Sequence, residues 1–112
     1  MKRIWAVALA MSLASGAAFS QSPALTTDWV PMSLSQDDCL ARAERVVRNI
    51  PLIRIERVRN SVFADTADKQ NQVVIRCVSD KQMAIFVAAG RHGDDQITAR
   101  WVARLLEAFD SR

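Results

Sequence analysis

Hydrophobic residues recur at helical spacing in two separate segments of the chain. The first segment spans residues 35 to 50, where Ser35 has the side chain of an N-cap and Pro51 ends the pattern. Asp37 and Asp38 follow the cap, where negative charge favours the start of a helix. We predict a helix here whose buried face carries Cys39, Ala43, Val46 or Val47, and Ile50.

The second helix is predicted over residues 96 to 109, with Asp94 or Asp95 as its cap. Its apolar positions recur every four residues, while Arg100, Arg104 and Glu107 stay outside that stripe. The stripe consists of Ile97, Trp101, Leu105 and Phe109, widened by Val102 and Leu106.

Alternating residues between the two helices predict a β-hairpin from "QVVIRCV" and "QMAIFVAA". A turn of two or four residues pairs Val78 with Met83, whereas a three-residue turn puts Ile85 and Val87 beside Cys77. In the two- or four-residue register one face carries Val73, Ile75, Cys77, Ala84, Phe86 and Ala88. The other face then carries Val74, Arg76, Val78, Met83, Ile85 and Val87, so both faces are largely apolar.

Residues 52 to 63 also alternate, with a bulge or short break expected near Glu56 and Arg57, and residues 64 to 71 are expected to form a polar loop. Residues 21 to 34 contain Pro23 and Pro31 without a clean period and are expected to form an irregular arm lying against the domain. The predicted fold is therefore α+β in the order αβββα. It consists of a three-stranded antiparallel meander with two helices packed on one face, in a single domain over residues 35 to 112.

The first twenty residues have the layout of a secretory signal peptide. Lys2 and Arg3 precede an apolar run, and small residues lead to Ser20, after which we expect cleavage. Without Lys2 and Arg3, 13 basic residues stand against 12 acidic ones, which gives no argument for nucleic acid. We expect a periplasmic or secreted protein with no membrane span after cleavage.

The chain contains two cysteines, and in an exported protein a pair is most economically a disulfide. Cys39 lies on the inward face of the first helix, and Cys77 lies at a strand position that can face that helix. We predict a structural disulfide between them. Neither a C-x-x-C pair nor an activated thiol is visible.

Two other sets of residues are functional candidates. His92 with Asp94 or Asp95 allows acid–base chemistry, but no nucleophile motif accompanies it, and a solvated loop residue is favoured. A single histidine also makes a metal site poor in ligands, so we expect no metal and no cofactor. Arg42, Arg45 and Arg48 lie at helical spacing and are candidates for anion binding, although a solvated charged face is favoured.

The second apolar face of the hairpin has no predicted helix to cover it. Three outcomes are open: the arm with Trp29, Val30 and Met32 covers it, a second copy packs on it, or a partner docks there.

The segments "CLARAERVVR", "SVF", "IRC" and "FVAAG" resemble a family of short exported bacterial proteins of unknown function, over Cys39 to Gly90. The resemblance implies a signal peptide, one cysteine pair and an α+β domain, and it carries no catalytic or binding residue. The leading hypothesis from the residues is a non-enzymatic module that binds a protein or a component of the cell envelope. The alternatives are a small hydrolase using His92 and a homodimeric accessory subunit.

Overall fold

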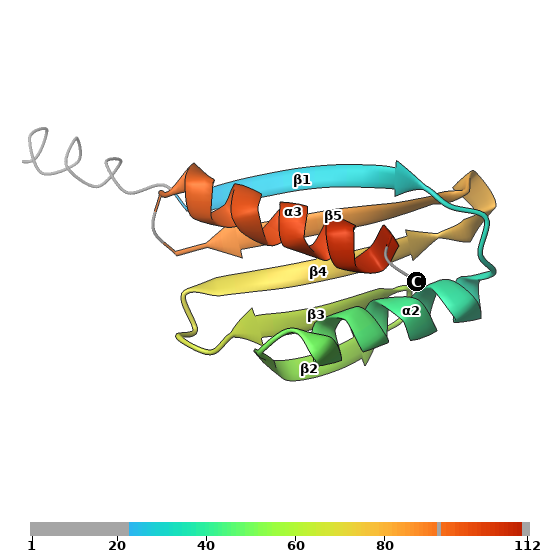
Figure 1. Ribbon diagram of the computed structural model, residues 1–112, viewed down its shortest axis with the longest axis horizontal. Coiled ribbons are helices and arrows are strands. Elements are labelled where there is room, and N and C mark those ends of the chain that lie inside the picture. Colours follow the sequence, from blue (N-terminus) through green and yellow to red (C-terminus); the bar gives the residue numbers. More distant parts are fainter. Residues whose placement is uncertain (1–22, 92, 111–112) are drawn as a thin grey trace, which may run out of the picture.

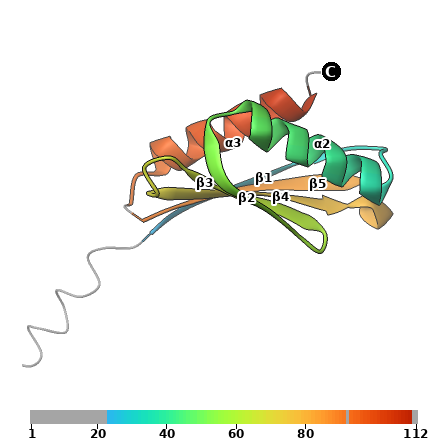
Figure 2. The same ribbon diagram turned by 90° about the horizontal axis from the view of Figure 1, so that it is seen from below.

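The computed structural model describes residues 23–91 and 93–110, which form an α+β domain of two layers. One layer is a five-stranded antiparallel sheet, and the other consists of the helices α2 (Gln36–Asn49) and α3 (Asp95–Asp110), both on one face of the sheet (Figures 1 and 2). The strands are β1 (Ala24–Pro31), β2 (Leu52–Val58), β3 (Ser61–Thr66), β4 (Asn71–Val78) and β5 (Met83–Gly90). Their order across the sheet is β1-β5-β4-β3-β2.

The expectation of a three-stranded meander is wrong because two further strands form. The first is β1, which arises from the segment expected to be an irregular arm and pairs antiparallel with β5 along its whole length. Pro31 is tolerated because β1 is an edge strand, where a missing N–H removes no bond from the ladder. The other edge strand is β2.

The second extra strand comes from residues 52 to 63, which were expected to form one strand. The chain turns back at Arg59 and Asn60, so that Val58 pairs with Ser61, and β3 continues to Thr66 into the expected polar loop. The expected irregularity is present, but it lies between Ile53 and Glu56, slightly earlier than predicted. Arg54, within this bulge, has a φ of 52°, a left-handed conformation that is costly for a residue with a Cβ atom.

The predicted hairpin is confirmed in the favoured register. Val78 pairs with Met83, Cys77 with Ala84 and Ile75 with Phe86, across a turn that contains the short 3-10 helix Ser79–Lys81. The side chains assigned to the helix side are all buried: Val73, Ile75, Cys77, Ala84, Phe86 and Ala88.

Helix α2 is fixed to the sheet at its first turn. The hydroxyl of Ser35 accepts a hydrogen bond from the backbone N–H of Asp38 at 3.2 Å, which confirms the predicted cap. The Gln36 side chain donates to the carbonyl of Cys77 and accepts from the N–H of Ser79. The predicted disulfide between Cys39 and Cys77 is present, and both cysteines are fully buried.

Helix α3 covers β1 and β5, and its apolar stripe closes the core. Phe109 meets Phe86 edge to face, with ring centroids 5.3 Å apart. The hydroxyls of Thr98 and Thr26 are 2.6 Å apart, which ties the helix to β1. The predicted cap is Asp94, whose carboxylate accepts from the N–H groups of Gln96 and Ile97.

Candidate functional site

The face of the sheet away from the helices, which we call the outer face, is open in the described domain. Side chains alternate along each strand, so the strand pairing determines which residues share this face. Its residues on the three strands β1, β5 and β4 are Leu25, Thr27, Trp29, Pro31, Met83, Ile85, Val87, Ala89, Gln72, Val74, Arg76 and Val78. On β3 they are joined by Phe63 and Asp65.

The six residues predicted for the second face lie together on the outer face as expected. Arg76 is exposed, and the other five, Val74, Val78, Met83, Ile85 and Val87, are half-buried. Their partial burial comes from neighbours in the sheet, since both helices lie on the opposite side (Figure 2). This arrangement places a continuous set of apolar side chains on the open side of the protein.

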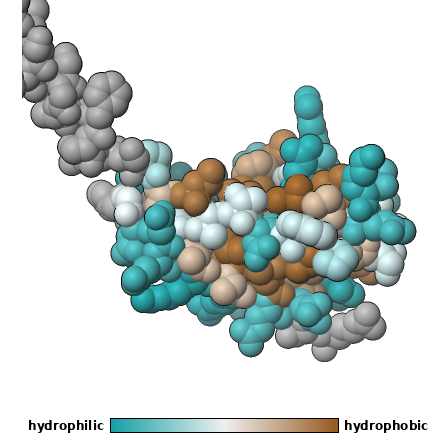
Figure 3. Space-filling view, turned by 90° about the horizontal axis from the view of Figure 1, so that it is seen from above, coloured by the Kyte–Doolittle hydropathy of each residue, from teal (hydrophilic) through white to brown (hydrophobic). Residues whose placement is uncertain are grey.

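The N-terminal segment adds to the outer face instead of covering it. Trp29 lies beside Ile85 and Leu25 beside Ala89, as parts of β1 in the same sheet. Their side chains are 57% and 64% exposed, the largest exposures of any bulky apolar residues in the described domain. Of the three outcomes left open for this face, covering by the arm is therefore ruled out, because Trp29 and Val30 pair with β5 as a fifth strand. Seen from the β1 edge, hydrophobic residues lie in the middle among residues of intermediate hydropathy, and hydrophilic residues lie around them (Figure 3).

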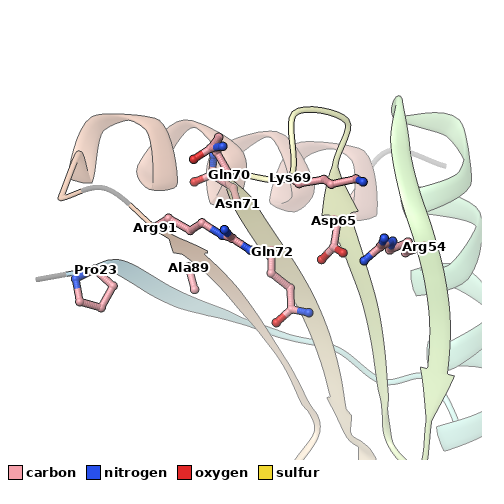
Figure 4. A pocket seen from close by; sticks show the side chains of 10 residues that line it. Pro23, Arg54, Asp65, Lys69, Gln70, Asn71, Gln72, Ala89 and Arg91 are labelled. Atoms are coloured by element: carbon pink, nitrogen blue, oxygen red, sulfur yellow. The ribbon is translucent and has the colours of Figure 1, made fainter.

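A cavity of about 410 Å³ lies at one end of the outer face, and we call it the end pocket. It forms where β3, β4 and β5 meet the loop after β3, close to Pro23 at the start of β1 (Figure 4). The residues that give it its chemical character are Arg54, Asp65, Lys69, Gln72, Ala89 and Arg91. Asp65, Gln72 and Ala89 are outer-face residues in adjacent strands, so the end pocket is continuous with that face.

The end pocket brings three cationic side chains around one carboxylate. Figure 4 shows Arg91 and Arg54 pointing toward each other from opposite sides, with Gln72 and Asp65 between them. Among the described residues, neither Arg54, Lys69 nor Arg91 has a side-chain hydrogen bond or an ion pair. Exposed cations without a partner that line one pocket favour the binding of an anion.

The loop beside the end pocket is held by a carboxylate. The hydroxyl of Thr66 donates to Asp68 at 2.6 Å, and the N–H of Gln70 donates to the same oxygen at 3.0 Å. These hydrogen bonds, first that of Thr66 and then that of Gln70, lower the pKa of the Asp68 carboxyl because they favour its charged form. The turn thereby positions Lys69, which follows Asp68 with a φ of 60°.

The arginines predicted to bind anions have other contacts. Arg42 lies over the ring of Phe109, 5.4 Å from its centroid, and Arg48 pairs with Glu44 at 3.1 Å. Arg45 is exposed on the same helix. These contacts fit the favoured interpretation of a solvated face partly paired with local groups, and anion binding there stays a prediction.

The residues of the hydrolase alternative are only partly described. His92 lies outside the described residues, while Asp94 uses one carboxylate oxygen to cap α3 and Asp95 is exposed in the first turn. Within residues 23–91 and 93–110, no three His, Cys, Asp or Glu side chains are grouped so as to hold a metal ion. None of the helices in this part of the chain is long and apolar enough to span a membrane.

Comparison with known proteins gives no relative from which a role can be transferred. No protein-family model matches the chain, and no curated protein matches it. The resemblance to short exported proteins therefore stays a prediction, and the function has to be argued from the outer face and the end pocket.

Sequence reasoning missed two parts of this site, Leu25 with Trp29 and the end pocket. The alternation of Leu25, Thr27 and Trp29 among β-forming residues was a usable signal, but the two prolines outweighed it. The end pocket had no such signal, because Arg54, Lys69 and Arg91 belong to three segments far apart in the sequence.

Proposed function

We propose that this protein is an exported, non-enzymatic binding module that engages a component of the cell envelope through the outer face of its sheet. One observation carries the proposal: the helices cover one face of the five-stranded sheet, and the other face presents apolar side chains that no element of residues 23–91 and 93–110 covers. Exposed contiguous apolar surface is costly in water and commonly marks a site of interaction.

The size of the apolar area supports the proposal. With strands about 4.8 Å apart and a rise of about 3.3 Å per residue, the outer sides of β1, β5 and β4 give an apolar footprint of roughly 300 Å². An area of that order is at the level where exposed patches on single proteins tend to be functional. Trp29, which is more than half exposed, is a residue type enriched in binding sites.

The disulfide supports the cellular location. Disulfides persist in oxidising compartments outside the cytoplasm, and the bond between Cys39 and Cys77 is consistent with such a compartment. The predicted signal peptide lies outside the described residues, and its removal is checked by N-terminal sequencing of the exported protein. We expect Gln21 as the first residue.

Site-specific photo-crosslinking in cells tests the binding function. A photoreactive amino acid replaces Ile85 on the outer face, and a matched variant carries it at Ala103, an exposed position on α3. We expect adducts at Ile85 and none at Ala103, and the mass of the adduct gives the class of the bound molecule. Equal labelling at the two positions, or no adduct at Ile85, contradicts the proposal.

Self-association is separated from the binding of another molecule by light scattering. The wild-type protein is compared with a variant that carries Met83→Glu and Ile85→Glu. A monomer in both cases, with an adduct at Ile85, agrees with the proposal. A wild-type dimer that becomes monomeric in the variant favours the alternative of a homodimeric accessory subunit.

A further inference from the structure

The outer residues of β5 form a continuous apolar row, which we call the β5 stripe: Met83, Ile85, Val87 and Ala89. The stripe is flanked by both apolar and polar residues: Pro31, Trp29, Thr27 and Leu25 of β1 on one side, and Val78, Arg76, Val74 and Gln72 of β4 on the other. Its last residue, Ala89, lines the end pocket together with Gly90 and Arg91. The β5 stripe therefore ends at the end pocket, where the cationic side chains lie.

The end pocket has more positive charge than its own carboxylate balances. Arg54 and Arg91 approach from β2 and from the end of β5, and Lys69 extends from the loop between β3 and β4 (Figure 4). Asp65 is the one acidic residue among those that line the pocket, and it forms no ion pair with a described residue. Two guanidinium groups and one ammonium group around a cavity are suited to the oxygens of a phosphate.

We propose that the β5 stripe and the end pocket together bind an anionic phospholipid, with an acyl chain along the stripe and the phosphate in the pocket. This inference rests on the proposed function and names its ligand. The apolar row matches the chain, and the adjoining unpaired cations match the charged head group.

The geometry of the sheet favours an acyl chain over an extended peptide. The backbone N–H and C=O groups of β5 point sideways into the ladders with β1 and β4, where they are already bonded. A peptide lying on the stripe would find no backbone partners for its own amides, and unpaired amides are costly to desolvate. An acyl chain has no such groups to satisfy.

The size of the apolar area disfavours a second copy of the chain. A standard interface between proteins buries about 800 Å² on each partner. The whole outer side of β1, β5 and β4, polar residues included, has a footprint of roughly 400 Å², about half of that. A two-fold axis parallel to the strands would also bring the two end pockets together, with cations facing cations.

The test is a titration of the purified, disulfide-bonded protein with dihexanoyl phosphatidylglycerol below its micellar concentration. Dihexanoyl phosphatidylcholine and inorganic phosphate are titrated in parallel. Tryptophan fluorescence is the signal, and the contribution of Trp29 is obtained by comparison with Trp29→Phe. We expect a saturable blue shift of Trp29 with phosphatidylglycerol, weaker binding of phosphatidylcholine, and no blue shift with inorganic phosphate.

Variants distinguish the contribution of the head group to binding from that of the acyl chain. Arg54→Gln combined with Arg91→Gln should weaken phosphatidylglycerol binding by roughly tenfold or more, because charge-assisted hydrogen bonds are lost. Arg59→Gln with Arg100→Gln removes the same charge at exposed positions that do not line the end pocket, and should leave binding unchanged. Ile85→Asn should weaken the binding of both lipids. Ile97→Asn, at an exposed position on α3, should weaken the binding of neither. If the pocket pair fails to fold, Lys69→Gln serves in its place, with a smaller loss expected.

Four outcomes overturn the inference. If the wild type and the pocket variants all bind phosphatidylglycerol and phosphatidylcholine with the same affinity, the end pocket does not bind the head group. If inorganic phosphate changes the fluorescence as much as phosphatidylglycerol does, the end pocket binds an anion without help from the β5 stripe. No shift with any lipid, together with a protein adduct at Ile85, rejects the lipid and retains the proposed binding function. No lipid shift and no adduct at Ile85 reject both.

Discussion

The two faces of the sheet carry similar apolar side chains but differ in what lies over them. On β5 alone, Phe86 and its inward neighbours are fully buried under the helices, while Ile85 and Val87, next to Phe86 in sequence, are half-buried on the outer face. The inner face also has the covalent connection, because the disulfide joins α2 to β4 on that side. The difference indicates that fold stability resides mainly on the inner face, while no described helix or loop covers the outer face.

The largest effect is expected from removing the disulfide, the covalent connection of the inner face. Replacing both Cys39 and Cys77 by alanine opens a loop with a sequence separation of 38 residues. The free energy of unfolding should fall by about 4 kcal/mol in the chain-entropy model. Urea denaturation of the two proteins measures it, with the reduced wild type as a control. The unreduced wild type should show no free thiol, and detection of two would contradict the structure.

A matched pair of isoleucines compares the faces directly. Ile75 is fully buried on the inner face of β4, and Ile85 is half-buried on the outer face of β5. Ile75→Ala should lower the free energy of unfolding by about 3 kcal/mol, because it leaves a cavity in a packed core. Ile85→Ala should lower it by about 1 kcal/mol or less. Equal losses in urea denaturation would mean that the outer face is packed in solution and is not open.

Two threonine substitutions compare how much a hydroxyl contributes to stability on each face. The hydroxyl of Thr98 is fully buried, lies 2.6 Å from the hydroxyl of Thr26 and donates to the carbonyl of Asp95. Thr98→Val should cost about 1 to 2 kcal/mol, because the Thr26 hydroxyl loses its partner on the inner face. Thr27→Val, exposed on the outer face, should change stability by no more than about 0.5 kcal/mol. Thermal unfolding of both variants checks the difference, and an equal loss for Thr27→Val would argue against the assignment of faces.

The inner face was predictable from the sequence because its signals are local and strong. Helical spacing, with Ser35 and with Asp94 or Asp95 as caps, identified both helices, and alternation identified the hairpin, of which one of the two expected registers places Cys77 opposite Ala84. The outer strands were not predictable in the same way. The alternation in β1 was outweighed by Pro23 and Pro31, and the alternation in β2 is interrupted by the bulge at Arg54.

The candidate site was predictable only in part for a related reason. The apolar positions of the hairpin follow from the period of two, and they were identified with the correct face. The end pocket depends on the order of strands across the sheet, which brings Arg54 and Arg91 to the same end. Strand order involves contacts between distant segments, and periodicity carries no information about them.

The smallest predicted effect concerns the loop between β3 and β4, which lies beside the end pocket. Thr66 is buried on the inner side of β3, and its hydroxyl donates to Asp68, whose pKa is lowered by this bond and by that of Gln70. Because the folded-state pKa lies below the unfolded value of 3.8, this contribution is complete above that pH and is lost as the pH falls through the folded pKa.

Asp68→Asn should therefore reduce the loss of thermal stability between about pH 5 and about pH 2 by a small amount. Thr66→Val should act in the same direction because it removes the donor, while Thr66→Ser keeps the hydroxyl and should retain the wild-type slope. Thermal melts of the four proteins across this range make the measurement. A steeper acid loss in Asp68→Asn than in the wild type would show that the carboxylate does not hold the turn, and Lys69 would then lack a fixed place in the end pocket.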